Sequence, residues 1–278
     1  MMDTSYIVYF LFGNKRKIFG TSIIVVMMLI TIFAEQIAPY DPLAMDFKPF
    51  LSPSTEHWLG TDNLGQDIYS QLIMSSRTSL SIGLIAATMV VFVGLTFGLI
   101  AGYKSGIIEN TLMGTTDLFI LIPSLPLTII LISYMGPSVY NIIIVITLLS
   151  WCGTARIVHS RVLQVKEQSF IESARMMAFS DRHIMFKHIL KNTEDVLLAR
   201  WCLAIVAAMM AEAGLAFLGL GDPFHVSWGG MITDAFSNGG YVRGMWWWYV
   251  MPGAMISLVA LAFFMLASFD KDHIYVEA

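Results

Sequence analysis

Long runs of apolar residues, separated by short polar stretches, dominate this sequence. Read with a window of about 19 residues, the pattern gives six apolar runs, at roughly 18–38, 80–103, 111–134, 138–155, 195–218 and 249–269. Each run is close to the length of about 20 residues with which a helix crosses a bilayer. The runs lack the alternation of a membrane barrel, and backbone polar groups must be paired inside hydrocarbon. The pattern therefore predicts an all-α, polytopic membrane protein with six transmembrane helices.

Composition supports this class and narrows the possible functions. Hydrophobic residues make up 56% of the chain and charged residues only 13%, which is typical of membrane proteins. The sequence has no G-x-x-x-x-G-K-[ST] phosphate loop, no H-E-x-x-H zinc motif and no G-x-S-x-G nucleophile motif. Cys152 and Cys202 have no metal-ligand spacing, and the 19 methionines are expected to fill the core. We therefore expect no enzyme activity, no cofactor and no metal site in this chain.

Half of the sixteen Lys and Arg residues lie in one segment, residues 156–200, here called the basic loop. If the N-terminus is inside, thirteen of the sixteen fall on the cytoplasmic side, including the cluster at 15–17, Lys104 and Lys271. Cytoplasmic loops are enriched in Lys and Arg. The distribution therefore predicts a cell-membrane protein with both termini and the basic loop in the cytoplasm. The predicted external segments are about 39–79, 136–137 and 219–249.

The pattern within the basic loop predicts two short amphipathic helices. Ser169 and Glu172 have the S-x-x-E spacing of a capping box, in which each side chain bonds to the other residue's backbone amide. Ser180 or Asp181 can cap a second helix, which has apolar residues on one side and charges on the other. The two helices predict a compact cytoplasmic knob, residues 169–190. Such a knob fits either the membrane surface or a groove in a partner protein.

Two carboxylates lie inside apolar runs, Asp117 in the third and Glu212 in the fifth. Ionisable residues inside membrane spans are costly and often mark a solute path or a proton relay. The alternative is a hydrogen bond that fixes one helix against another. The sequence leaves both interpretations open for both residues.

Glycine and proline positions predict how two of the runs pack and bend. Gly94, Gly98 and Gly102 follow one another at four-residue spacing, which lets a neighbouring helix approach closely. Pro123 and Pro126 remove backbone donors from the third run and crowd the preceding turn. We therefore expect tight packing along the second run and a kink in the third.

The stretch from Glu172 to Asp181, ESARMMAFSD, resembles the EAA loop of permease subunits of binding-protein-dependent ABC importers. More narrowly, the chain is similar to the shorter, C-type permease of the dipeptide, oligopeptide and nickel group, which has one helix before a five-helix core. Further matching motifs keep the same order and spacing: LGTDNLGQDIYSQL (59–72), AGYKSG (101–106), EAGLAFLGLGDP (212–223) and SWGGMI (227–232).

The resemblance implies the type I ABC importer transmembrane fold, with a first part at 1–79 and a five-helix core at 80–278. It implies that the chain forms half of an import path for di- or oligopeptides. The implied partners are a homologous second permease, two cytoplasmic ABC ATPases, an external solute-binding protein and membrane lipid, but no nucleic acid. ATP and Mg²⁺ belong to the ATPase subunits. Nickel, metal chelates or oligosaccharides remain alternative cargoes, and a self-contained proton-coupled secondary transporter is the alternative from another class.

The resemblance also assigns roles to individual residues. The residues assigned to ATPase coupling all lie in the knob: Ser169, Glu172, Ser173, Ala174, Arg175, Ala178, Ser180 and Asp181. Within this set Glu172 is expected to be the charged contact, and Ala174 to allow close approach of the ATPase by its small size. Contact with the external binding protein is assigned to Asp62, Asp67 and Trp228.

The chain departs from the family pattern at four positions. The usual glycine at the turn of the knob is Ala178, and the usual proline after His-Ile-Leu is Lys191. The family often has arginine where Gln66 and Gln71 stand, so a charge role is not expected there. A left-handed alanine costs on the order of 1 kcal/mol. We therefore predict that Ala178 has a negative φ and that the bend is displaced or shallower.

Overall fold

The computed structural model describes residues 10–268, and no β-strand occurs within them. The predicted cytoplasmic position of the two termini, and of Lys271, falls outside the described residues. The described chain forms helices in the order α2 (Lys15–Ile32), α3 (Ala34–Ile37), α4 (Ile68–Tyr103), α5 (Ile107–Leu121), α6 (Ser124–Met135), α7 (Val139–Lys166), α8 (Ser169–Met176), α9 (Asp181–His183), a π-helical segment (Ile184–Ile189), a 3-10 turn (Lys191–Thr193), α10 (Glu194–Phe217), α11 (Trp228–Ser237) and α12 (Trp246–Ala267).

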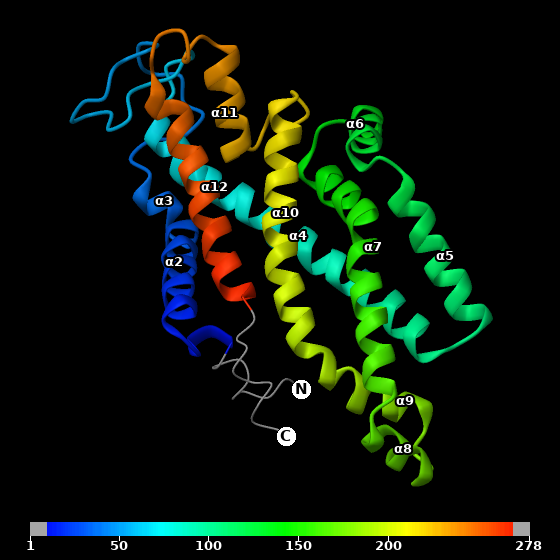
Figure 1. Cartoon of the computed structure of the whole chain (residues 1–278). Coiled ribbons are helices and arrows are strands. Elements are labelled where there is room, and N and C mark those ends of the chain that lie inside the picture. Colours follow the sequence, from blue (N-terminus) through cyan, green and yellow to red (C-terminus); the bar gives the residue numbers. More distant parts are fainter. Residues whose placement is uncertain (1–9, 269–278) are drawn as a thin grey trace.

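Long apolar helices run between the two ends of the molecule (Figure 1). Within residues 10–268, four continuous helical stretches are long and apolar enough to cross a membrane, and they contain α4, α7, α10 and α12. The bent pair of α5 and α6 makes a fifth if it counts as one span. Helix α2 is not among them, because Lys15, Arg16 and Lys17 occupy its first turn. The all-α membrane class is confirmed, whereas the predicted count of six spans is not.

Two helices extend well beyond the apolar runs that predict them. Helix α4 begins at Ile68, where the side chain of Asp67 accepts a hydrogen bond from the backbone N–H of Ser70 and caps the helix. Helix α7 continues to Lys166, inside the basic loop. Hydropathy marks only the part of a helix that lies in hydrocarbon, so polar extensions escape it. Helix α4 also runs unbroken across residues 79 and 80, and the division of the chain at that point stays a prediction.

The third apolar run forms two helices, α5 and α6, that meet at an angle of 84°. The predicted bend is confirmed, but it is a break between helices rather than a kink within one. Ile122 is extended, with ψ 126°, as expected of a residue that precedes proline. Pro123 is the N-cap of α6, and Pro126 lies in its first turn, where a missing N–H disturbs no helical hydrogen bond.

The predicted close packing of the glycines in α4 is confirmed, and the neighbour is α7. A Cβ atom built on Gly94, Gly98 or Gly102 would lie 2.6, 2.5 or 2.7 Å from the nearest atom of α7. These distances are too short for any side chain, so the absence of a Cβ is what lets the two backbones touch.

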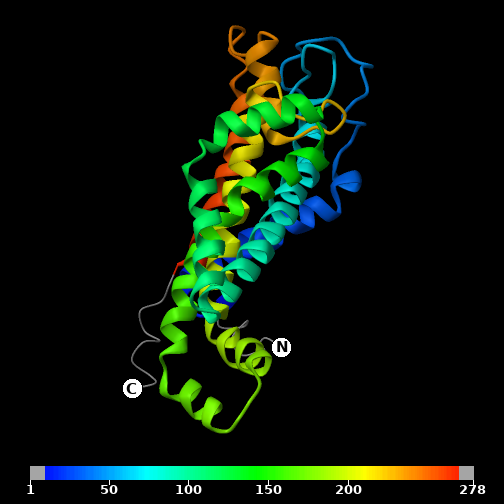
Figure 2. The ribbon, with the colours of Figure 1, turned by 90° about the vertical axis from the view of Figure 1, so that its right-hand side faces the viewer.

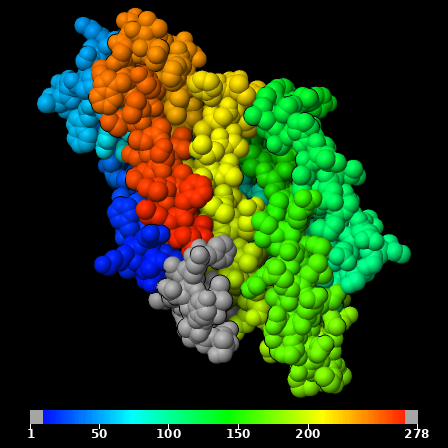
Figure 3. All heavy atoms as spheres, viewed as in Figure 1, coloured from blue at the N-terminus to red at the C-terminus, as the bar shows by residue number. Residues whose placement is uncertain are grey.

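The helices form two groups joined by α10, with α2 and α12 on one side and α5 to α7 on the other (Figure 3). Helix α4 crosses behind both groups. The knob, the start of α2 and the end of α4 lie at one end of the molecule, and α11 lies at the other (Figures 1 and 2). The basic segments therefore share one end, as the charge distribution predicts. Trp228 and Trp248 are completely buried in the core formed by α4, α10, α11 and α12.

Candidate functional site

The knob is mounted on the C-terminal ends of α4 and α7. Its buried residues, Ile171, Ala174, Ile184 and Ile189, pack in one cluster with Leu99, Tyr103, Val158 and Val162. Its opposite surface exposes large apolar side chains, among them Met176, which is 81% exposed, and Met177, Phe179 and Phe186. The knob is therefore fixed to the spans on one side and offers an apolar tip on the other.

The predicted capping box at the start of α8 is wrong. Ser169 is the first residue of the helix, and the N-cap is Gln168, which makes no side-chain cap hydrogen bond. The Ser169 carbonyl oxygen instead accepts a hydrogen bond from the Ser173 hydroxyl at 3.1 Å. Because the helix starts one residue earlier than the box requires, the Glu172 carboxylate does not fold back onto the backbone. Within residues 10–268 this exposed carboxylate has no hydrogen bond or ion pair.

The predicted cap of the second helix is confirmed at Ser180, whose hydroxyl accepts a hydrogen bond from the His183 N–H at 3.3 Å. The helix continues as the π-helical segment Ile184–Ile189 rather than as an α-helix. Bonding from residue i to i+5 brings residues five apart onto one face. That geometry explains how both isoleucines at the ends of the segment point into the core.

Ala178 is left-handed, with φ 58°, so the prediction of a negative φ is wrong. Its N–H donates to Arg175 O at 2.9 Å, and the Phe179 N–H donates to Ala174 O at 3.2 Å. These two bonds form a Schellman motif, which satisfies carbonyls that the end of a helix otherwise leaves unpaired. The motif gives the knob its sharp turn without glycine and offsets the cost of the strained residue.

Two residues assigned to the ATPase contact serve the knob itself. Ala174 is 1% exposed, so its small size lets α8 approach the spans of its own chain rather than a partner. Asp181 accepts a hydrogen bond from the Tyr103 hydroxyl at 2.6 Å, and Lys166 Nζ donates to Tyr103 O at 2.8 Å. Tyr103 ends α4, so the first bond fixes the knob to that helix and the second joins the ends of α4 and α7. Among the assigned residues only Ala174 is buried, and Glu172, Ser173 and Arg175 lie on the exposed side of α8.

The residues assigned to the external contact, Asp62, Asp67 and Trp228, are buried. Trp228 Nε1 donates to Leu72 O at 3.1 Å. Asp67 lies 2.9 Å from His57 Nδ1, in addition to its role as a helix cap. These side chains hold the segments before α4 and α11 against α4 and offer no surface to a partner, which corrects the expectation of a direct contact.

Gln66 and Gln71 take part in the same buried network. Gln71 Nε2 donates to Asp62 Oδ2 at 2.7 Å and to Gln66 Oε1 at 2.8 Å. The Gln66 N–H donates to Asp62 Oδ1 at 2.9 Å. The side-chain amide of Gln71 and the backbone N–H of Gln66 therefore satisfy a buried carboxylate by hydrogen bonding, where an arginine would do so by charge.

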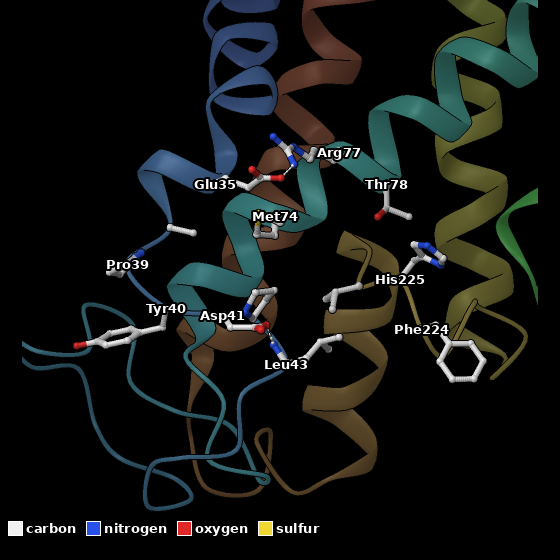
Figure 4. Close-up of a pocket in the computed structure, with 13 residues that line it drawn as sticks. Glu35, Pro39, Tyr40, Asp41, Leu43, Met74, Arg77, Thr78, Phe224 and His225 are labelled. Carbon is white, nitrogen blue, oxygen red and sulfur yellow. Dashed lines mark hydrogen bonds and ion pairs between the residues drawn. The ribbon is translucent and has the colours of Figure 1, made fainter.

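A cavity of about 650 Å³ opens at the end of the molecule that carries α11, between α3, the start of α4 and residues 224–226 (Figure 4). Arg77 lies on its wall, pairs with Glu35 at 2.5 Å and donates to the carbonyl oxygens of Thr31 and Ile32. The guanidinium thus satisfies carbonyls at the C-terminal end of α2, which is a structural role.

Asp222 joins the segment before α11 to the start of α7. Burial alone would raise the pKa of Asp222. Hydrogen bonds from the backbone N–H groups of Val139 and Phe224, together with His225, outweigh burial and hold that pKa below its ordinary value. The ionised carboxylate therefore fixes the N-terminal end of α7.

The two carboxylates inside the spans have different surroundings. Glu212 is buried and accepts a hydrogen bond from the Ser227 hydroxyl at 2.6 Å, and Ser227 in turn caps α11. This is the helix-fixing contact that the sequence left open. Asp117 forms an ion pair with Arg156 of α7. Reasoning from the sequence missed this partner, although Arg156 is the first charge after a long apolar stretch of α7.

Comparison with known proteins gives the family. Residues 94–272 match the family of the binding-protein-dependent transport system inner membrane component, and this match covers more than half of the chain. The chain belongs to this family. Residues 6–63 also match the N-terminal transmembrane domain of oligopeptide transport permease C. The resemblance seen in the EAA loop is thereby confirmed, and with it the type I ABC transmembrane fold.

Several members of the family are similar to almost the whole chain. The dipeptide transport system permease protein DppC of Bacillus subtilis is 33% identical over 262 residues, 93% of this chain and 81% of the relative. The probable D,D-dipeptide transport system permease protein DdpC of Escherichia coli is 32% identical over 268 residues, 96% and 89% of the two chains. The glutathione transport system permease protein GsiD of Pectobacterium atrosepticum is 31% identical over 254 residues, 90% and 83%. These relatives are transport permeases, not enzymes.

Proposed function

We propose that this chain forms one half of the path of an ATP-driven importer for di- or oligopeptides. The permeases compared above are named for the transport of dipeptides, D,D-dipeptides and glutathione, which all contain amide-linked amino acids. In this proposal a homologous permease supplies the other half of the path, and an external binding protein delivers the peptide. Two cytoplasmic ATPases bind ATP and Mg²⁺, so the permease carries out no chemical step.

We further propose that the knob couples the path to an ATPase subunit on the cytoplasmic side. The observation that carries this proposal is the exposed apolar tip around Met176 and Met177, next to the free carboxylate of Glu172. An apolar patch beyond the ends of the spans is typical of a protein interface. In this account Glu172 provides a charged contact at the rim of the interface, and the two methionines enter a groove on the ATPase.

The buried side of the knob suggests how movement reaches the spans. Ile171 and Ile184 pack on α4 and α7, and the Tyr103 hydroxyl bonds to Asp181. Closing of the two ATPases on ATP would therefore displace the knob and the inner ends of both helices as one rigid body. Such displacement would change the population of outward-open and inward-open states of the path.

Glu172→Lys tests the coupling contact directly. We expect this charge reversal to weaken copurification of the ATPase subunits with the permease by about tenfold, because it replaces a rim contact with repulsion. The matched control is Glu56→Lys, which reverses an exposed carboxylate in the external segment. Both variants are purified in detergent, and the amount of bound ATPase is measured. Equal retention of the ATPases by both variants would contradict coupling through Glu172.

A further inference from the structure

Two polar side-chain pairs join α5 to α7. Asp117 pairs with Arg156, and Glu109 Oε1 lies 2.9 Å from His159 Nε2. The two carboxylates are eight residues apart on α5, and their partners are three apart on α7, so each helix presents its pair on one face. The Asp117 and Arg156 side chains are nevertheless 57% and 55% exposed. This ion pair therefore lies on an open face of the chain.

The charges of the Asp117–Arg156 pair make lipid an unsuitable neighbour for that face. Asp117 lies inside the apolar run at 111–134, ten residues from the start of α5. Arg156 directly follows the apolar run at 138–155 and lies ten residues before the end of α7. Charged side chains in or beside an apolar span are expected to face protein or water.

The break between α5 and α6 is a second, independent sign that lipid does not cover this face. It begins one helical turn beyond Asp117, and every residue from Leu121 to Pro126 is exposed in the chain. Non-helical backbone at membrane depth is tolerated where protein buries it or where it lines a water-filled cavity. In transporters, such broken helices form solute sites near the middle of the membrane. The ion pair and the break thus point to the same conclusion.

We propose that the open face of α5 and α7 lines the solute path and that Asp117 and Arg156 bind the two ends of a short peptide with free termini. The Asp117 carboxylate accepts hydrogen bonds from the peptide ammonium group, and the Arg156 guanidinium donates to the peptide carboxylate. This inference rests on the proposed function and names the chemical class that the path recognises. In the empty path the two side chains neutralise each other.

Binding at this site is expected to be weak, which suits a path rather than a storage site. When a zwitterionic peptide binds, the ion pair between Asp117 and Arg156 is lost and each side chain pairs with one end of the peptide. The loss of the first pair partly offsets the gain from the two new ones. Passage through a membrane requires contacts that are favourable enough for the solute to enter and weak enough for it to leave. A blocked peptide without terminal charges cannot open the ion pair between Asp117 and Arg156.

Gly114→Cys provides a reporter that leaves both charges in place. Gly114 lies one turn before Asp117, and a Cβ atom built there meets no other atom within 4 Å. The matched control is Leu118→Cys, which lies next to Asp117 on another side of α5 and is 65% exposed. The native Cys152 and Cys202 are buried and leave a low background. Each variant is assembled with the partner subunits in membranes and treated with a hydrophilic methanethiosulfonate reagent.

We expect the Gly114→Cys thiol to react about tenfold faster than the Leu118→Cys thiol, because only the former faces water. Alanyl-alanine should slow the reaction at Gly114→Cys about threefold, whereas N-acetylalaninamide, which lacks both charges, should not. Protection should disappear when Asp117→Asn or Arg156→Gln is added to the reporter. If the ion pair only held α5 against α7, alanyl-alanine would protect the thiol equally well in those variants.

Three results would overturn the proposal: equal reaction rates at the two positions, no protection by alanyl-alanine, or protection that survives both substitutions. A failure of the proposed function is recognised separately. It would appear as a complete wild-type transporter that takes up no peptide, whatever the rates of labelling.

Discussion

At the scale of single residues, the knob depends on Ala178, which holds a left-handed backbone conformation without being glycine. The sequence correctly identifies a costly position, but the cost of about 1 kcal/mol is smaller than the benefit of the two amide hydrogen bonds that close the turn. The burial of Asp62 and Trp228 is equally hidden in the sequence, because their partners are set by packing. Trp228 bonds to Leu72, which lies far away in the chain. Polar residues of this kind are easily mistaken for surface contacts.

Ala178→Gly should stabilise the knob by about 1 kcal/mol, because glycine adopts the left-handed conformation without strain. The measurement is amide hydrogen exchange of the knob, followed by mass spectrometry of the purified protein. Exchange should slow about fivefold if it occurs by local opening. The control is Ala174→Gly, which places glycine inside α8 at a buried position and should accelerate exchange. Exchange in Ala178→Gly that equals or exceeds the wild-type rate would show that the turn carries no strain.

At the scale of helices, hydropathy predicts where the spans lie, and side-chain chemistry decides where they end. The run at 195–218 corresponds closely to α10 (Glu194–Phe217), whereas α4 starts well before its run because Asp67 caps an external extension. The bend at Pro123 is predicted from the sequence. Its angle of 84° is not, because the angle depends on how α5 and α6 each pack on α7. Glycine spacing predicts close contact but does not identify the partner helix.

Gly98→Ala tests the contact between α4 and α7. The added Cβ atom would lie 2.5 Å from Ala155 O, so the two backbones must separate, and we expect a loss of stability of about 1 to 3 kcal/mol. The matched control is Gly253→Ala in α12, where a Cβ atom meets nothing within 4 Å and alanine favours the helix. Thermal unfolding of the purified protein in detergent measures both. A Gly98→Ala variant as stable as Gly253→Ala would contradict the close packing.

At the scale of the whole molecule, the two ends are built from different elements. One end carries the knob and the basic segments, and the other carries α11 and the buried network of the external segment (Figure 1). Between them lie the Asp117–Arg156 ion pair, which joins α5 to α7, and the bend between α5 and α6. The family shows that the chain is a transport permease. Its dependence on ATPase subunits is the central claim of the proposed function, and it distinguishes this protein from a secondary transporter that acts alone.

Uptake of alanyl-alanine into proteoliposomes tests that claim most directly. One set of vesicles contains this chain alone, and the other contains the complete complex with the binding protein on the opposite side from the ATPases. We expect ATP-dependent uptake by the complete complex and no uptake by the chain alone, with or without a proton gradient, because one half of a path supplies neither energy nor a closed channel. Proton-driven uptake by the chain alone would show that it is a secondary transporter instead.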